Sequence, residues 1–128
     1  MAQLLDPVPE LGLHLDVGHA NLMVEYNTTD ELLRAYGTRL SHVHLHDNKG
    51  ASADLHLPLG AGTLDTKYYV CALQAVGYDS TISLEVFTPD RHYLVYSREV
   101  LRRVWDECAR VAGARQRSKK SLNPNNKG

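Results

Sequence analysis

Side chains that could do chemistry are concentrated in residues 40–62, LSHVHLHDNKGASADLHLPLGAG. The stretch combines one apolar run with four imidazoles and two carboxylates: His42, His44, His46, Asp47, Asp54 and His56. Such groups need a hydrogen-bond partner or a ligated ion wherever they are buried. Their concentration in one stretch therefore predicts a metal site.

The elements that must position this site alternate between two patterns. Segments with strand periodicity or β-branched content occur at 11–17, 40–46 and 81–86, and helical periodicity occurs at 28–37, 65–77 and 88–113. A β-α-β-α-β-α order predicts parallel strands joined by right-handed crossovers, with helices covering the sheet. The fold class is therefore α/β.

The helix boundaries carry their own signals. Thr28 followed by Glu31 is typical of a capping box, and Gly37 predicts the end of that helix. Thr88 and Pro89 predict the start of the last helix, with proline at its first position and Gly113 at its end.

Three side chains fall near the carboxyl ends of the strands: Asp16, His44 and Glu85. Neighbouring parallel strands end at the same rim, where such folds place their chemistry, so these side chains should converge. Oxygen and imidazole ligands suit Mn²⁺, Mg²⁺, Zn²⁺ or Fe²⁺. Taken alone, Asp16 could equally be a turn carboxylate that accepts backbone N–H groups, whereas Glu85 lies in a strand too apolar for a solvated role.

Strand alternation separates the histidines of 40–46 from their apolar neighbours. His42, His44 and His46 share one side, and Val43 and Leu45 take the other. Either His44 or His46 is then the ligand. We expect His42 to be structural and His46 to orient a ligand or contact substrate.

The loop that follows offers further groups. Asp54 and His56 lie on one side of an extended segment and could complete a second metal, hold a substrate hydroxyl, or simply be solvated. The tight turn Gly60–Gly62 could offer N–H groups to a phosphate. His14 and His92 belong to no motif and are expected to be structural or exposed.

Length and composition fit one modest domain. The 128 residues are 43% hydrophobic with a formal net charge of −1. Residues 1–10 are predicted to be an irregular lead-in, 11–113 the folded part, and 114–128 a disordered basic tail. Because the tail takes much of the positive charge, the body is acidic, which argues against nucleic acid as the main partner.

Cysteine usage and the N-terminus bear on location. Cys71 and Cys108 are isolated thiols within apolar helical patterns, which predicts reduced core residues. No run of about 18 apolar residues exists, and the first residues lack the regions of a signal peptide. We therefore expect a cytoplasmic protein with no membrane partner.

Four stretches together resemble a known family: LDVGHAN, HVHLHDNKG, DLHLPLGAG and SLEVF. In this order and spacing, the chain resembles the sugar phosphate isomerase/epimerase family of xylose isomerase-like TIM barrels, which is related to endonuclease IV. The resemblance covers about residues 11–112. It implies a partial (β/α)8 barrel, the last three of eight strand–helix units.

The resemblance also implies roles for individual residues. Asp16, His44 and Glu85 would be metal ligands, and His19 would contact metal or substrate. Glu85 would also act as a base in proton transfer beside a carbonyl, through an enediolate. The endonuclease IV branch adds ligands at positions that match Asp54 and His56.

These observations predict a divalent-metal-dependent sugar or sugar-phosphate isomerase or epimerase. His19, His46 and His56 are the expected substrate contacts. Alternatives are an endonuclease IV-like phosphodiester hydrolase in DNA repair and a non-catalytic barrel remnant. A TIM barrel takes about 250 residues, so we expect a fragment, a truncated reading frame, or a piece completed by a second chain, with weak metal binding and no turnover alone.

Overall fold

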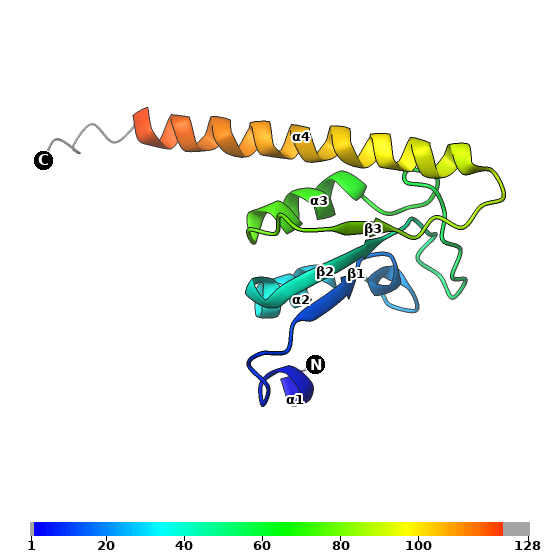
Figure 1. Cartoon of the computed structure of the whole chain (residues 1–128), viewed down its shortest axis with the longest axis horizontal. Coiled ribbons are helices and arrows are strands. Elements are labelled where there is room, and N and C mark those ends of the chain that lie inside the picture. Colours follow the sequence, from blue (N-terminus) through cyan, green and yellow to red (C-terminus); the bar gives the residue numbers. More distant parts are fainter. Residues whose placement is uncertain (1, 122–128) are drawn as a thin grey trace, which may run out of the picture.

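A three-stranded parallel sheet organises the protein (Figure 1). A computed structural model describes residues 2–121. The strands are β1 (Leu13–Asp16), β2 (Leu40–Leu45) and β3 (Ile82–Leu84), in the order β1-β2-β3. The predicted α/β class and parallel pairing are confirmed.

Helices connect and follow the strands. They are α1 (Ala2–Leu5), α2 (Thr29–Tyr36), α3 (Thr66–Ala75) and α4 (Arg91–Ser121), with 3-10 turns η1 (His19–Asn21) and η2 (Gly37–Arg39). The segment expected to be an irregular lead-in therefore contains one helical turn, α1. The guanidinium of Arg39 ties this segment to the body by donating to the carbonyls of Leu5, Val8 and Leu11.

The core lies between one face of the sheet and α2, α3 and α4. Alternation along β1 and β2 sends four apolar side chains to that face: Leu13, Leu15, Val43 and Leu45, each at most 3% exposed. Leu15, Val43 and Leu45 pack in one cluster with the apolar sides of the helices, through Leu33, Val70, Leu73, Val100 and Val104. The opposite face of the sheet carries polar side chains, and these include the side chains predicted to form the site.

The first helix boundary corrects the sequence interpretation. Thr28 precedes α2 but makes no side-chain cap. Asn27 takes that role, because its Oδ1 accepts the N–H of Thr29 at 2.9 Å while its amide donates to the carbonyl of Val17. The capping-box prediction at Thr28 and Glu31 is therefore wrong.

The last helix differs from expectation at both ends. It begins at Arg91, two residues after Pro89, and Asp90 accepts the N–H of His92 at 2.9 Å. It then continues past Gly113 to Ser121. The prediction of disorder from residue 114 is wrong for 114–121, where alanine, arginine, glutamine and lysine favour helix. Residues 122–128 lie outside the described part of the chain.

The two cysteines also differ from expectation. Cys71 on α3 and Cys108 on α4 form a disulfide, with their Cα atoms 5.2 Å apart. The prediction of two reduced thiols is therefore wrong, and the cysteines no longer support a cytoplasmic location. Within residues 2–121, no helix combines the length and the apolar character needed to span a membrane.

Candidate metal centre

The rim at the carboxyl end of the sheet brings three side chains together. Asp16 ends β1, His44 lies opposite it on β2, and Glu85 directly follows β3. The Nδ1 atom of His44 lies 2.9 Å from Glu85 Oε1 and 3.8 Å from Asp16 Oδ2. This is the convergence that the strand positions predicted. The role of these side chains as ligands stays a prediction.

His19 links this rim to the loop after β2. Its Nδ1 lies 2.7 Å from Asp16 Oδ2, and its Nε2 lies 3.0 Å from Asp54 Oδ2. The other oxygen of Asp54 lies 3.1 Å from His56 Nε2. Single ligand atoms of His19, His46, Asp54 and His56 all fall within 4.8 Å of one another, as do those of Asp16, His19 and Glu85.

The turn after β1 explains how His19 reaches both groups. Its backbone N–H donates to Asp16 Oδ1 at 2.8 Å, and residues 19–21 then form a 3-10 turn. Gly18 makes room for the neighbouring imidazole, because a Cβ there would lie 2.4 Å from His46 Nε2. Glycine at this position is thus required for the close approach of the ring.

His56 is fixed more firmly than an extended loop would suggest. Its backbone has φ of +45°, and its carbonyl accepts the N–H of Phe87 at 3.1 Å. Its Nδ1 lies 2.8 Å from the carbonyl oxygen of Glu85, which can only accept, so Nδ1 carries a proton and Nε2, beside Asp54, is the nitrogen left to ligate an ion. A ligating histidine is commonly oriented in this way.

Ring stacking adds a second restraint on His56. The imidazoles of His46 and His56 stack with centroids 4.0 Å apart, and Phe87 stacks on His56 at 4.3 Å. Phe87 is 68% exposed. Sequence reasoning missed this residue, although an aromatic side chain two positions after a rim glutamate was available as a signal.

The surroundings of Asp16 and Asp54 favour the ionised form that binds a cation. Burial works to raise the pKa of Asp16, but the His46 ring and the His19 backbone N–H hold that pKa well below the usual range of a carboxyl group. The hydrogen bond from His19 lowers the pKa of Asp54. Burial opposes protonation of His19 and His46, yet the neighbouring carboxylates raise the pKa of both imidazoles. The carboxylates are therefore ionised at neutral pH.

His46 provides the strongest test of whether the donors fit a metal. The side chain is fully buried, and its Nε2 has no hydrogen-bond partner of good geometry. The nearest anionic atom is Asp16 Oδ1, 3.4 Å away. An unpaired buried nitrogen is costly. Because this atom faces a group of imidazoles and carboxylates, the donor set fits a divalent cation.

Asp47 belongs to the same stretch but has a different task. It is fully buried, and its two oxygens accept four backbone N–H groups at 2.8 to 3.0 Å, from Asn48, Gly60, Gly62 and Leu64. The N–H groups of the Gly60–Gly62 turn that were expected to be available to a phosphate are therefore occupied by Asp47. The phosphate interpretation of this turn is wrong.

A family model described as xylose isomerase-like TIM barrel matches residues 1–104. The chain belongs to this family. The uncharacterised protein MJ1311 of Methanocaldococcus jannaschii is 36% identical over 92 residues, which are 72% of this chain and 30% of that protein. The crystal structure of a D-tagatose 3-epimerase-like protein superposes with a TM-score of 0.66 and 31% identity, over 79% of this chain and 37% of that one.

Membership of a barrel family explains the two faces of the sheet. The chain spans 30% and 37% of these two relatives, so it corresponds to part of a barrel. In a closed barrel, helices cover the outer face and the other face lines the interior. The face that carries the rim side chains is therefore the barrel's inner face, and a xylose isomerase-like barrel would place the candidate metal centre at its mouth.

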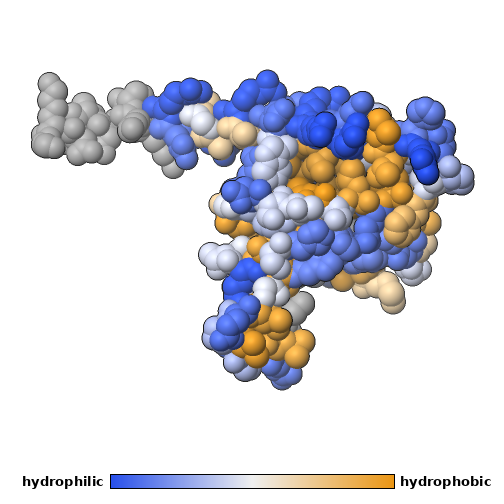
Figure 2. All heavy atoms as spheres, viewed as in Figure 1, coloured by the Kyte–Doolittle hydropathy of each residue, from blue (hydrophilic) through white to orange (hydrophobic). Residues whose placement is uncertain are grey.

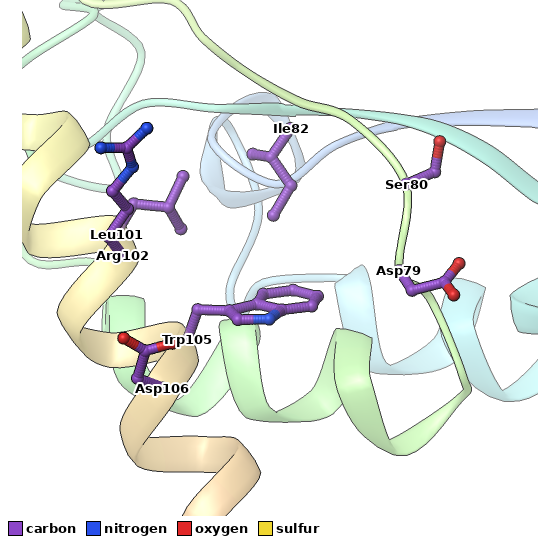
Figure 3. A pocket seen from close by; sticks show the side chains of 7 residues that line it. All are labelled: Asp79, Ser80, Ile82, Leu101, Arg102, Trp105 and Asp106. Carbon is purple, nitrogen blue, oxygen red and sulfur yellow. The ribbon is translucent and has the colours of Figure 1, made fainter.

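The same comparison accounts for a cavity away from the site. A cavity of about 600 Å³ lies between β3 and α4, where Ile82, Leu101 and Trp105 point toward one another (Figure 3). Apolar side chains are gathered beneath α4 on this side (Figure 2). None of the predicted site residues lines the cavity. β3 is an edge strand of this sheet, and a closed barrel pairs such an edge with a further strand.

Proposed function

We propose that the rim holds a divalent cation, Mn²⁺, Mg²⁺ or Zn²⁺, in a protein that isomerises or epimerises a sugar or sugar phosphate. The observation that carries the proposal is the convergence of Asp16, His44 and Glu85, with 2.9 and 3.8 Å between His44 Nδ1 and the two carboxylates. Family membership supports the isomerase and epimerase class. Since the chain covers only part of its relatives, the activity is proposed for the complete barrel.

The protein's own residues suggest how the reaction would proceed. A bound cation would polarise the carbonyl and hydroxyl oxygens of a sugar. Glu85 is partly exposed and directly follows β3 at the rim, so its carboxylate could take a proton from the carbon beside the carbonyl and return it. His19 would orient a sugar hydroxyl, whereas the fully buried His46 would position Asp16 and His56 from behind, and stacking on Phe87 keeps His56 in place.

Metal binding can be tested on this chain. Titration with Mn²⁺, followed by electron paramagnetic resonance of the free ion, should detect weak binding that Glu85→Gln reduces at least tenfold. His92→Gln is the matched control, because that imidazole is 94% exposed and pairs with Asp90 instead of with a predicted ligand. Equal Mn²⁺ affinity in the two variants would contradict the assignment of Glu85 as a ligand.

Turnover needs an intact barrel, so the assay uses MJ1311, a longer relative of which this chain matches 30%. Incubation with a panel of ketoses in deuterated water with Mn²⁺ should incorporate deuterium at carbon. The absence of exchange with every ketose would count against the isomerase proposal. For the present chain we expect no turnover.

A second candidate function rests on one specific observation. Asp54 lies within 3.1 Å of both His19 and His56, close enough to support a second ion beside the first. Pairs of metal ions are typical of phosphodiester hydrolases, including endonuclease IV-like enzymes of DNA repair. Cleavage of abasic-site DNA by the intact relative would favour this function, because an isomerase should give none.

A non-catalytic role is the third possibility, in which the chain docks onto another subunit. The free edge of β3 and the cavity between β3 and α4 support it. Size-exclusion chromatography separates the outcomes: a monodisperse dimer would support docking or a barrel completed by a second chain, whereas a poorly folded monomer would indicate a fragment.

A further inference from the structure

A second group of imidazoles lies on the inner face of the sheet, below the rim. His14 on β1 pairs in register with His42 on β2, and His44 follows two residues later. The ring of His14 lies 4.1 Å from that of His44 and 5.1 Å from that of His42. One nitrogen from each of the three rings lies within 4.8 Å of the others.

His14 and His42 occupy a distinct layer of the inner face, below His44 at the rim. His14 lies two residues before Asp16, and His42 lies two residues before His44, so the layer is about 7 Å below the rim. The interior layers of TIM barrels are usually filled by branched apolar side chains. An imidazole layer departs from that pattern and needs polar partners if the barrel closes over it.

Ser83 on β3 orients the ring of His42. Its hydroxyl lies 3.0 Å from His42 Nε2. When Nε2–H donates to this oxygen, Nδ1 of His42 holds the lone pair that can bind a metal. A hydrogen bond on the opposite nitrogen is the usual support for a ligating histidine.

We propose that His14, His42 and His44 form a second cation site for a late transition metal such as Zn²⁺, Ni²⁺ or Cu²⁺. Sites made of imidazoles favour these ions, whereas Mg²⁺ and Mn²⁺ prefer the oxygen ligands of the rim. Because a neutral imidazole has one free lone pair, His44 ligates one ion at a time, and the two sites compete for it. The site does not depend on the proposed catalytic function, since His14 and His42 lie outside the rim.

The test is a Zn²⁺ titration of the whole chain, read by the ring nitrogens of its histidines in long-range ¹H–¹⁵N spectra. Each histidine is assigned by its own substitution to glutamine. The ring resonances of His14 and His42 should shift with Zn²⁺, while those of the exposed His92 stay in place. Unchanged His14 resonances at saturating Zn²⁺ would overturn the proposal.

Two variants sharpen the result. His14→Gln should raise the Zn²⁺ concentration needed to shift His42 at least tenfold, and His42→Gln should do the same for His14. His92→Gln is the matched control and should change neither. A His42 response that is equal in His14→Gln and His92→Gln would also overturn the proposal.

Failure of this proposal and failure of the proposed function are distinguishable in the same spectra. His19 and His56 report the rim, whereas His14 and His42 report the layer below it. Shifts of His19 and His56 with His14 and His42 unchanged would support the metal centre and reject the second site, and shifts of His14 and His42 with His19 and His56 unchanged would do the reverse.

Discussion

Asp47 and Asp54 lie seven residues apart in one stretch, yet the structure gives them opposite surroundings. Asp47 is fully buried, and its oxygens accept four backbone N–H groups. The side chain of Asp54 is 47% exposed and pairs with the imidazoles of His19 and His56. The difference lies in the partners: a backbone N–H keeps its proton, whereas an imidazole can release one and accept a metal ion.

Conversion of each aspartate to alanine tests this comparison most strongly. Asp47→Ala leaves four buried or part-buried donors without an acceptor, at about 1–3 kcal/mol each, so it should lower the free energy of unfolding by about 4 kcal/mol or more. Urea unfolding measures the change. Asp54→Ala is the matched variant and should alter stability by less than about 1 kcal/mol. Similar losses of unfolding free energy in the two variants would contradict the difference described between Asp47 and Asp54.

The disulfide lies on the helical side of the sheet and should stabilise the scaffold without affecting the site. Cys71 and Cys108 close a loop with a sequence separation of 37. The chain-entropy model then gives about 3–4 kcal/mol of stabilisation. Thermal unfolding with and without reductant should show the loss, and Mn²⁺ affinity below the transition should stay within twofold. A parallel fall in Mn²⁺ affinity would show that scaffold and rim are coupled.

The turn at Gly60–Gly62, whose N–H groups donate to Asp47, offers a matched pair of substitutions with smaller expected losses of stability. A Cβ at Gly62 would lie 2.1 Å from the carbonyl oxygen of Asn48, whereas nothing lies within 4 Å of one at Gly60. Gly62→Ala should therefore cost about 2–3 kcal/mol through steric overlap. Gly60→Ala should cost about 1 kcal/mol, through its φ of +87° alone. Chemical denaturation that ranks them in reverse order would contradict the described turn.

The smallest expected effect concerns the start of α4. The hydrogen bonds from His92 to Asp90 lower the pKa of this exposed carboxyl group in the folded state. Its contribution to stability is therefore present above the unfolded pKa and fades as pH falls through the lowered folded value. Asp90→Asn keeps a capping oxygen that does not titrate. Between pH 5 and pH 2 the parent should lose slightly more thermal stability than this variant, and identical pH profiles would contradict the assignment.

The sequence predicted the parallel α/β order and the meeting of Asp16, His44 and Glu85, because strand periodicity and strand ends are local signals. The role of Asp47 as an acceptor of backbone hydrogen bonds could not be predicted from such local signals. Its donors come from residues 48–64, and only the folded loop brings them to one carboxylate. The disulfide depended similarly on how α3 packs against α4. At Thr28 the failure was local, because Asn27 offered an equally good cap one residue earlier.

The length of α4 affects how the molecule moves in solution. At 1.5 Å per residue, a helix of 31 residues is about 46 Å long, and its C-terminal part extends beyond the sheet (Figure 1). Rotation about the helix axis should therefore be faster than end-over-end tumbling. The single tryptophan, Trp105, lies on this helix, so its polarised fluorescence decay should follow a particle more elongated than a sphere of 14.3 kDa.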